Sequence, residues 1–83
     1  MEEKMKLEKK KYAKKTIILY VLKMLQEGSS KEKPLTYTSM TKVLNSIGIT
    51  CDRKTVKRNV DYLIDFGYKI VILESKKGCY LEQ

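Results

Sequence analysis

The sequence predicts a mainly α-helical domain that ends in a small β-hairpin. Three observations lead to this prediction. The chain has 83 residues, which is enough for one small domain with a modest core. Apolar residues recur at helical spacing in three segments, at about residues 16–27, 36–46 and 52–66. After Gly67 this spacing changes to a run rich in β-branched residues, which is typical of a strand.

A lysine-rich segment precedes the first predicted helix. Residues 1–15 hold seven lysines and three glutamates. We assign residues 1–13 to a charged N-terminal arm or helix extension, and residues 14–83 to the folded domain. The composition of the arm fits either a solubilising tail or a basic arm that contacts phosphates or a minor groove.

The first predicted helix has an unusually wide apolar face. Four apolar residues at offsets 0, 3, 4 and 7 define its centre: Ile18, Val21, Leu22 and Leu25. Three more widen it: Ile17, Tyr20 and Met24. The surplus fits either a broad core stripe or a homodimer contact through this helix. We expect Gly28 to end the helix as its C-cap.

A second helix follows a polar loop. Thr36 or Thr38 is expected to be its N-cap, and Gly48 its end. The residues predicted to face inward are Met40, Val43, Leu44 and Ile47. Only a short turn separates this helix from the third, so the pair has the form of a helix-turn-helix.

The third predicted helix has clear start and stop signals. Asp52 is a good N-cap, and Gly67 can adopt the left-handed conformation that ends a helix. Its predicted core face consists of Val56, Val60, Leu63 and Ile64.

The charges of this third helix oppose its dipole. Its first two turns carry Arg53, Lys54, Lys57 and Arg58, and its last two carry Asp61 and Asp65. The dipole favours the reverse order by roughly 0.3–1 kcal/mol per charge. Local rules of stability tend to be broken where function requires it, and a cationic N-terminal half suits insertion into a DNA major groove. A solvated basic face is the alternative interpretation.

The C-terminal segment predicts a hairpin. Tyr68–Glu74 reads as a strand, residues 75–78 as a turn, and Cys79–Leu81 as a returning strand. Three helices followed by a two-stranded wing is the element order of a winged helix-turn-helix.

Composition favours an anionic partner over catalysis. The net charge is +8 and the sequence pI about 9.5, which favours binding to a polyanion. No histidine is present, and Cys51 and Cys79 cannot complete a zinc site. We therefore expect no metal, no cofactor and no enzymatic activity. Thiolate chemistry at Cys51 stays open, because a cysteine before a helix N-terminus can have a lowered pKa.

The sequence shows no secretory signal and no apolar run long enough to span a bilayer. We expect a cytoplasmic protein with two free thiols.

The run DRKTVKRNVDYLIDFGYKI, with GCYL after it, resembles the N-terminal winged helix of WYL-domain transcriptional regulators, and more broadly DeoR-like (HTH-11) winged helices. The matching residues are Arg53, Thr55, Val56, Arg58, Val60, Leu63, Gly67, Ile70, Gly78, Tyr80 and Leu81. The likeness covers roughly residues 14–82. It implies DNA binding and transcription regulation.

Two departures from that family pattern are visible. Asn59 stands where the family usually has an aspartate. The sensor and C-terminal domains that normally follow are absent from these 83 residues, which fits either a fragment or a stand-alone module. We expect no small-molecule ligand within this chain.

Helical geometry and the resemblance together select the DNA-binding residues. The helix at about residues 52–66 is expected to enter the major groove, with Lys54, Thr55 and Arg58 nearest the bases. Phosphate contacts are expected from Arg53 and Lys57. Further contacts are expected from Tyr62 in the same helix, from hydroxyl and backbone groups at the start of the second helix, and from the wing tip: Thr36, Tyr37, Thr38, Lys76 and Lys77.

The expected partner is double-stranded DNA, bound by a dimer on a palindrome. The alternative is a winged helix that serves protein–protein contact or acts as an accessory module without sequence-specific DNA binding. Duplex DNA binding and capture of a protein partner distinguish the two.

Overall fold

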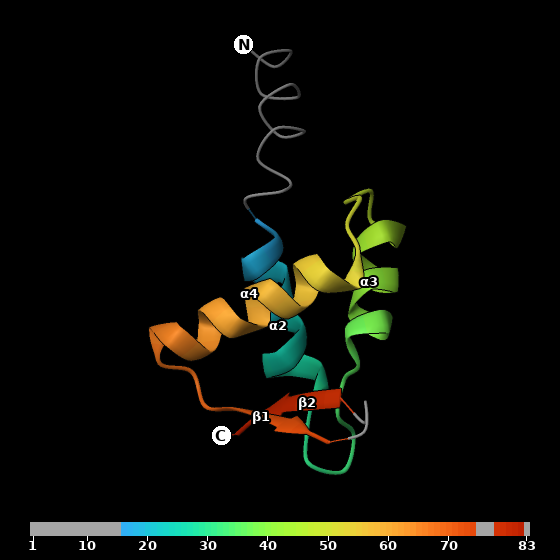
Figure 1. Ribbon diagram of the computed structural model, residues 1–83. Coiled ribbons are helices and arrows are strands. Elements are labelled where there is room, and N and C mark those ends of the chain that lie inside the picture. Colours follow the sequence, from blue (N-terminus) through green and yellow to red (C-terminus); the bar gives the residue numbers. More distant parts are fainter. Residues whose placement is uncertain (1–15, 75–77, 83) are drawn as a thin grey trace.

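The computed structural model describes residues 16–74 and 78–82 (Figure 1). It has three helices and an antiparallel hairpin, which confirms the predicted fold class and is compatible with a winged helix. In chain order the elements are α2 (Ile17–Gly28), α3 (Tyr37–Ser46), α4 (Arg53–Phe66), β1 (Ile70–Leu73) and β2 (Gly78–Leu81). The predicted arm at residues 1–13 and the wing-tip residues Lys76 and Lys77 lie outside the described residues.

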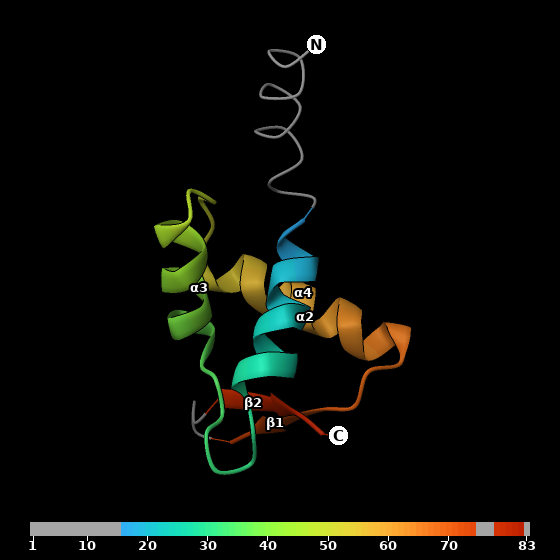
Figure 2. The ribbon, with the colours of Figure 1, turned by 180° about the vertical axis from the view of Figure 1, so that it is seen from behind.

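Helices α2 and α4 cross, with α3 beside both of them. Figure 1 shows α4 in front of α2, and the view from behind shows α2 in front of α4 (Figure 2). The N-terminal end of α4 lies near α3, while its C-terminal end projects at the opposite side of the molecule in both views. This arrangement leaves one long face of α4 open to solvent.

The hairpin is joined to the loop before α3. Strands β1 and β2 pair from Ile70 opposite Leu81 to Leu73 opposite Gly78. The N–H of Leu35 donates to the carbonyl oxygen of Cys79, and the N–H of Cys79 donates back to Leu35, both at 2.8 Å. This bridge holds the hairpin beside the N-terminus of α3.

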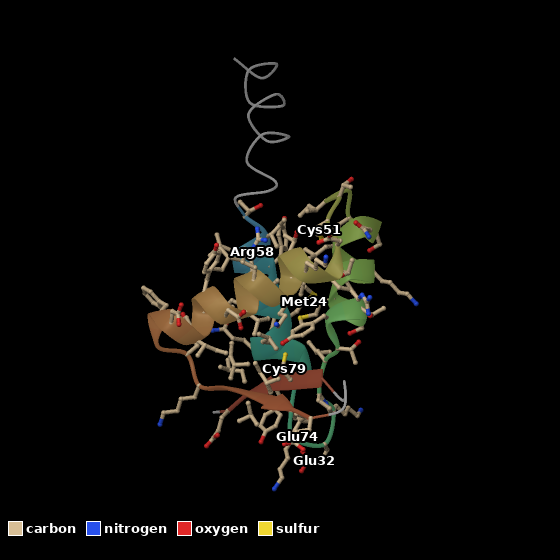
Figure 3. All side chains as sticks on the ribbon, viewed as in Figure 1. Met24, Glu32, Cys51, Arg58, Glu74 and Cys79 are labelled. Carbon is tan, nitrogen blue, oxygen red and sulfur yellow. The ribbon has the colours of Figure 1, made fainter. Side chains whose placement is uncertain are left out.

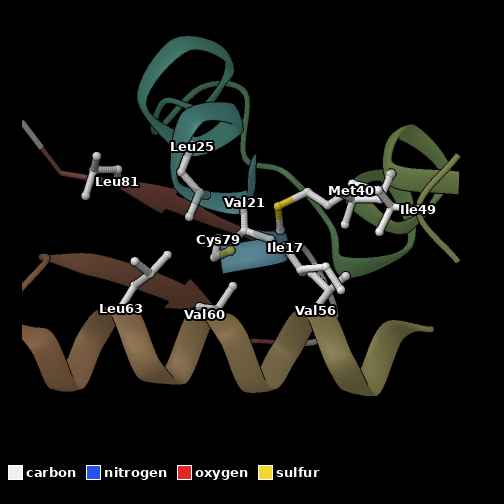
Figure 4. Close-up of a cluster of buried hydrophobic side chains, with 11 residues drawn as sticks. Ile17, Val21, Leu25, Met40, Ile49, Val56, Val60, Leu63, Cys79 and Leu81 are labelled. Atoms are coloured by element: carbon white, nitrogen blue, oxygen red, sulfur yellow. The ribbon is translucent and has the colours of Figure 1, made fainter. Parts of the chain in front are cut away.

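One apolar cluster forms the core between the helices and the hairpin (Figure 4). The predicted core face of α4 is confirmed at three of its four positions, because Val56 and Val60 are fully buried and Leu63 is 4% exposed. The fourth residue, Ile64, is only partly buried and packs against the core. The remaining buried residues come from the other elements and from the turn before α4: Ile17, Val21, Leu25, Met40, Leu44, Ile49, Cys79 and Leu81. No buried polar or charged residue is found among the described residues.

The predicted inward face of α3 is wrong at two of its four positions. Met40 and Leu44 are buried, but Val43 and Ile47 are 47% and 51% exposed. Ile47 lies just after the helix end, at the C-cap. Ile49 takes the core position instead, and its N–H donates to the carbonyl oxygen of Leu44 at 2.9 Å. Because α3 packs at the edge of the domain, its core stripe is narrow.

The predicted face of α2 is rotated slightly. Its buried centre is Ile17, Val21 and Leu25, whereas Ile18 and Leu22 are only partly buried. These three buried residues lie at offsets 0, 4 and 8, in one row along α2. They are the most buried because the crossing α4 contacts a narrow stripe of α2.

Helix ends agree with the sequence signals except at α2. Gly48 and Gly67 have φ of 92° and 127°, as expected for glycines that end helices. Gly28, in contrast, is the last helical residue, and Ser29 is the C-cap. The Ser29 hydroxyl donates to the carbonyl oxygen of Leu25 and accepts from the N–H of Leu81 at 3.0 Å. This serine therefore supplies the polar contact that ends α2.

Candidate nucleic-acid interface

The N-terminus of α4 is defined by its cap. A carboxylate oxygen of Asp52 accepts from the N–H of Thr55 at 2.9 Å. Hydrogen bonds from Thr55 hold the pKa of this carboxyl below its usual range. The cap therefore stays ionised and acts as an acceptor at neutral pH.

Four cations follow this cap along α4. All of them are exposed, and within residues 16–74 and 78–82 none forms a salt bridge: Arg53, Lys54, Lys57 and Arg58. Arg58 extends from the middle of α4 on the edge farther from the hairpin (Figure 3). The helix dipole opposes these charges, and among the described residues the carboxylate of the cap Asp52 interacts with Lys54 without forming an ion pair.

A cleft of ≈ 380 Å³ lies between the start of α3, the first turns of α4 and the hairpin. The structure brings six of the sequence-predicted site residues together around it: Thr36, Tyr37, Thr38, Arg53, Lys54 and Lys57. Arg58, Thr55 and Tyr62 do not line this cleft. The cleft therefore joins the phosphate-binding residues predicted on two separate helices.

The N-terminus of α3 faces this cleft with unused donors. Thr36 caps the helix: its hydroxyl accepts from the N–H of Ser39 at 2.9 Å, and the Ser39 hydroxyl accepts from the N–H of Thr36 at 3.2 Å. The N–H groups of Tyr37 and Thr38 make no hydrogen bond within the described part of the chain. Such free N–H groups at a helix start favour an anion.

Tyr37 does not have the role expected from the sequence. Its hydroxyl is buried and has no hydrogen-bond partner among the described residues. Burial raises the pKa of this hydroxyl, and Cys79 and Asp61 raise it further. The buried hydroxyl is not exposed to a phosphate in this position, although Tyr37 is one of the residues that line the cleft.

The remaining predicted residues of α4 fall into two groups. Thr55 is half-buried, and its carbonyl oxygen accepts from the side-chain amide of Asn59 at 2.8 Å. Asn59 therefore has a structural contact within α4. Arg58 and Tyr62 lie on the exposed side, with Tyr62 52% exposed. Along the open face of α4, the N-terminal half therefore carries cations and the C-terminal half carries aromatic and acidic residues.

Sequence reasoning missed the floor of the cleft, which is formed by Ile72, Leu73 and Gly78 of the hairpin. No local pattern places these residues opposite α4. The bridge between Leu35 and Cys79 places these residues opposite α4, because it fixes the position of the hairpin.

The two cysteines are free. Burial raises the pKa of the Cys51 thiol, and the charge of Asp52 raises it further. The raised pKa disfavours thiolate chemistry at Cys51, which the sequence had left open, because burial and the capping carboxylate beside it both oppose a thiolate. Burial raises the pKa of the Cys79 thiol to about 11.

Within residues 16–74 and 78–82, no group of acidic, cysteine and histidine side chains is arranged to hold a metal ion. In the same residues no helix has the length and apolarity needed to cross a membrane.

Comparisons of the chain with protein-family models, with curated proteins and with solved structures found no match. The resemblance to WYL-domain and DeoR-like winged helices therefore stays a prediction, and the function is argued from the residues of this chain.

Proposed function

We propose that this chain is a winged helix-turn-helix module that binds double-stranded DNA in a sequence-specific way, as a transcriptional regulator or as its N-terminal DNA-binding domain. The observation that carries the proposal is the open N-terminal half of α4, which presents four exposed cations beside a cleft shared with the start of α3. Cations on a helix that fits a major groove supply both phosphate contacts and base contacts.

The proposed roles follow from position. Arg58 and Lys54 are exposed on α4 and would contact base edges, with Arg58 suited to guanine O6 and N7; Lys54 does so from the margin of the cleft, which it also lines. Arg53 and Lys57 line the cleft, where they would hold a backbone phosphate together with the free N–H groups of Tyr37 and Thr38. Tyr62, Thr36, Lys76 and Lys77 would add contacts at the margins.

A basic helix that is only solvated explains the observations less well. An arrangement shaped for stability alone would place acidic residues near the α4 N-terminus. In this chain only the cap, Asp52, is acidic there, and the four cations have no ion pair among the described residues. The cationic half of α4 thus costs stability locally, which is consistent with a binding role.

The test is a selection of random duplexes on the purified chain, followed by titration of the selected site. Arg58→Ala is expected to weaken binding to that site by ~1–3 kcal/mol and to relax the preference at one base pair. Lys57→Ala is expected to weaken binding to all DNA sequences alike. It should also reduce the slope of the logarithm of the binding constant against the logarithm of the salt concentration by about one.

Lys42→Ala is the matched control, because Lys42 is an exposed lysine of α3 that does not line the cleft. It should leave the base preference unchanged. Equal affinity of Arg58→Ala and the parent for the selected site contradicts the groove assignment. Absence of any enriched sequence, with capture of a protein partner, supports the alternative of a protein-binding winged helix.

A further inference from the structure

The C-terminal end of α4 carries an aromatic patch, of which the proposed function uses only Tyr62, at its margin. Phe66 is 82% exposed, and its ring stacks on Tyr68 with centroids 5.9 Å apart. Tyr62, one turn before Phe66, is 52% exposed. Single exposed apolar residues are ordinary, but a cluster of aromatic rings at a projecting helix end is typical of an interaction surface. We call Tyr62, Phe66 and Tyr68 the aromatic patch.

The charges beside this patch have both signs. Asp65 and Lys69 are exposed, and neither forms a salt bridge within residues 16–74 and 78–82. In a two-fold contact, a residue of one copy that touches a second residue of the other copy is matched by the reverse contact, and residues at the axis meet their own copies. Asp65 of each copy can therefore pair with Lys69 of the other, which makes the patch complementary to itself.

The position of the patch also suits a pair of DNA-binding modules. The C-terminal end of α4 lies at one side of the molecule, away from α3 (Figures 1 and 2). Two copies joined there keep both cationic halves on one face. Joining through the outward face of α2, which lies behind α4, would turn the two α4 helices away from each other.

We propose that the aromatic patch is a homodimer contact, in which two copies of the chain meet at the C-terminal ends of their α4 helices. This inference names the partner of the proposed DNA-binding module, and its consequence for DNA rests on that proposed function. The Phe66 rings form the centre of the contact, and the pairs of Asp65 with Lys69 form its rim.

The dimer sets a spacing between the two cationic halves. Val56, in the middle of the cationic half, is ten residues before Phe66, which is ~15 Å along a helix axis. If the two α4 helices lie end to end, the distance between the two cationic halves is twice this length plus a side-chain contact of ~5–10 Å between the helix ends. The cationic halves are then ~35–40 Å apart. This is close to the ~34–36 Å of one DNA turn, so inverted half-sites one turn apart are expected.

The test measures self-association of the full chain by sedimentation velocity over a range of concentrations, without DNA. The parent is expected to dimerise, and Phe66→Ala to weaken the dimer at least about tenfold because a central aromatic anchor is lost. Glu74→Lys, a charge reversal at the exposed other end of β1, is the matched control and should dimerise like the parent.

Charge reversal makes the test specific for the paired contact. Asp65→Lys alone and Lys69→Asp alone each place like charges opposite one another and should weaken the homodimer. An equimolar mixture of these two variants should associate again, because each contact then joins opposite charges. All four residues changed are exposed, and thermal unfolding followed by circular dichroism verifies that each variant is folded.

A parent chain that stays monomeric at all concentrations overturns the proposal, as does a dimer that is insensitive to all of these changes or is broken by Tyr20→Asp in α2 instead. A monomer that binds one half-site specifically refutes the dimer and leaves the DNA-binding function. A dimer that depends on the patch and selects no duplex refutes the DNA-binding function and leaves the dimer.

Discussion

At the scale of single residues, Tyr37 shows how burial separates a predicted role from the actual one. Its position at the start of α3 suggested a hydroxyl available to a phosphate, but the hydroxyl is buried without a partner among the described residues. An unmade hydrogen bond of a buried group is expensive. The tyrosine is therefore kept in the core at a cost to stability.

Tyr37→Phe removes that cost. We expect the free energy of unfolding to rise by on the order of 1 kcal/mol, because the buried hydroxyl is lost while the ring keeps its packing. Urea denaturation measures it. Tyr62→Phe, at an exposed position, should leave the free energy unchanged. A clear loss of stability in Tyr37→Phe would show that the hydroxyl has a partner in solution.

The two thiols predict an order of reaction. Cys79 is fully buried and its pKa is raised to about 11, so at pH 8 it holds almost no accessible thiolate. Cys51 is only partly buried, although its pKa is raised as well. We expect iodoacetamide to modify Cys51 first and Cys79 only after unfolding. Peptide mass mapping over time checks this, and equal rates in the folded chain would contradict it.

At the scale of elements, α4 and α3 differ in how well periodicity predicts burial. Helix α4 crosses α2 near its middle and has the hairpin below it in Figure 1, so three of the four residues of its apolar face are buried and Ile64 is partly buried. Helix α3 lies at the edge, where the same spacing leaves Val43 and Ile47 exposed. Periodicity therefore identifies a candidate face, and neighbouring elements decide how much of it is buried.

This difference can be measured within α3. Leu44→Ala is expected to lower the free energy of unfolding by ~2–5 kcal/mol, because the side chain is fully buried. Val43→Ala, one residue earlier and 47% exposed, should change it by less than ~0.5 kcal/mol. The measurement is urea denaturation of both variants. Similar losses in the two would mean that the sequence-predicted face was right.

At the scale of the whole molecule, a close backbone approach at Gly78 helps to position the hairpin, beside the hydrogen bonds between Leu35 and Cys79. Gly78 begins β2 with φ of 108°, and a Cβ built there would lie 2.5 Å from the carbonyl oxygen of Leu35. Glycine permits both the conformation and the approach. Through this contact, the connection between α2 and α3 determines where the hairpin lies against the cleft.

Gly78→Ala tests that role. We expect a loss of at least ~1–3 kcal/mol in the free energy of unfolding, because the alanine is strained and collides with backbone atoms. The measurement is urea denaturation. Gly28→Ala is the control, since a Cβ there meets nothing within 4 Å and the residue is helical; a gain of ~0.4–1 kcal/mol is expected. An unchanged Gly78→Ala would contradict the close approach.

The candidate site was predictable in its parts. Asp52, Gly67 and the buried face of α4 follow from signals within a few residues, so the ends and orientation of that helix could be inferred directly. The cations of α4 and the cap of α3 were also identified. The cleft was not, because Ile72 and Leu73 join it only through pairing of the hairpin with a distant loop.

The amino-acid sequence by itself determined the elements of the described part of this protein: three helices, of which the last has cations at its start, and a hairpin. Capping, glycine conformation and apolar spacing act between residues close in the chain, so they can be interpreted locally. Only the tertiary structure decided that the hydroxyl of Tyr37 is buried, that Val43 is exposed and that two helices share a cleft with the hairpin. Burial depends on which elements cover one another, and that coverage is set by contacts far apart in sequence.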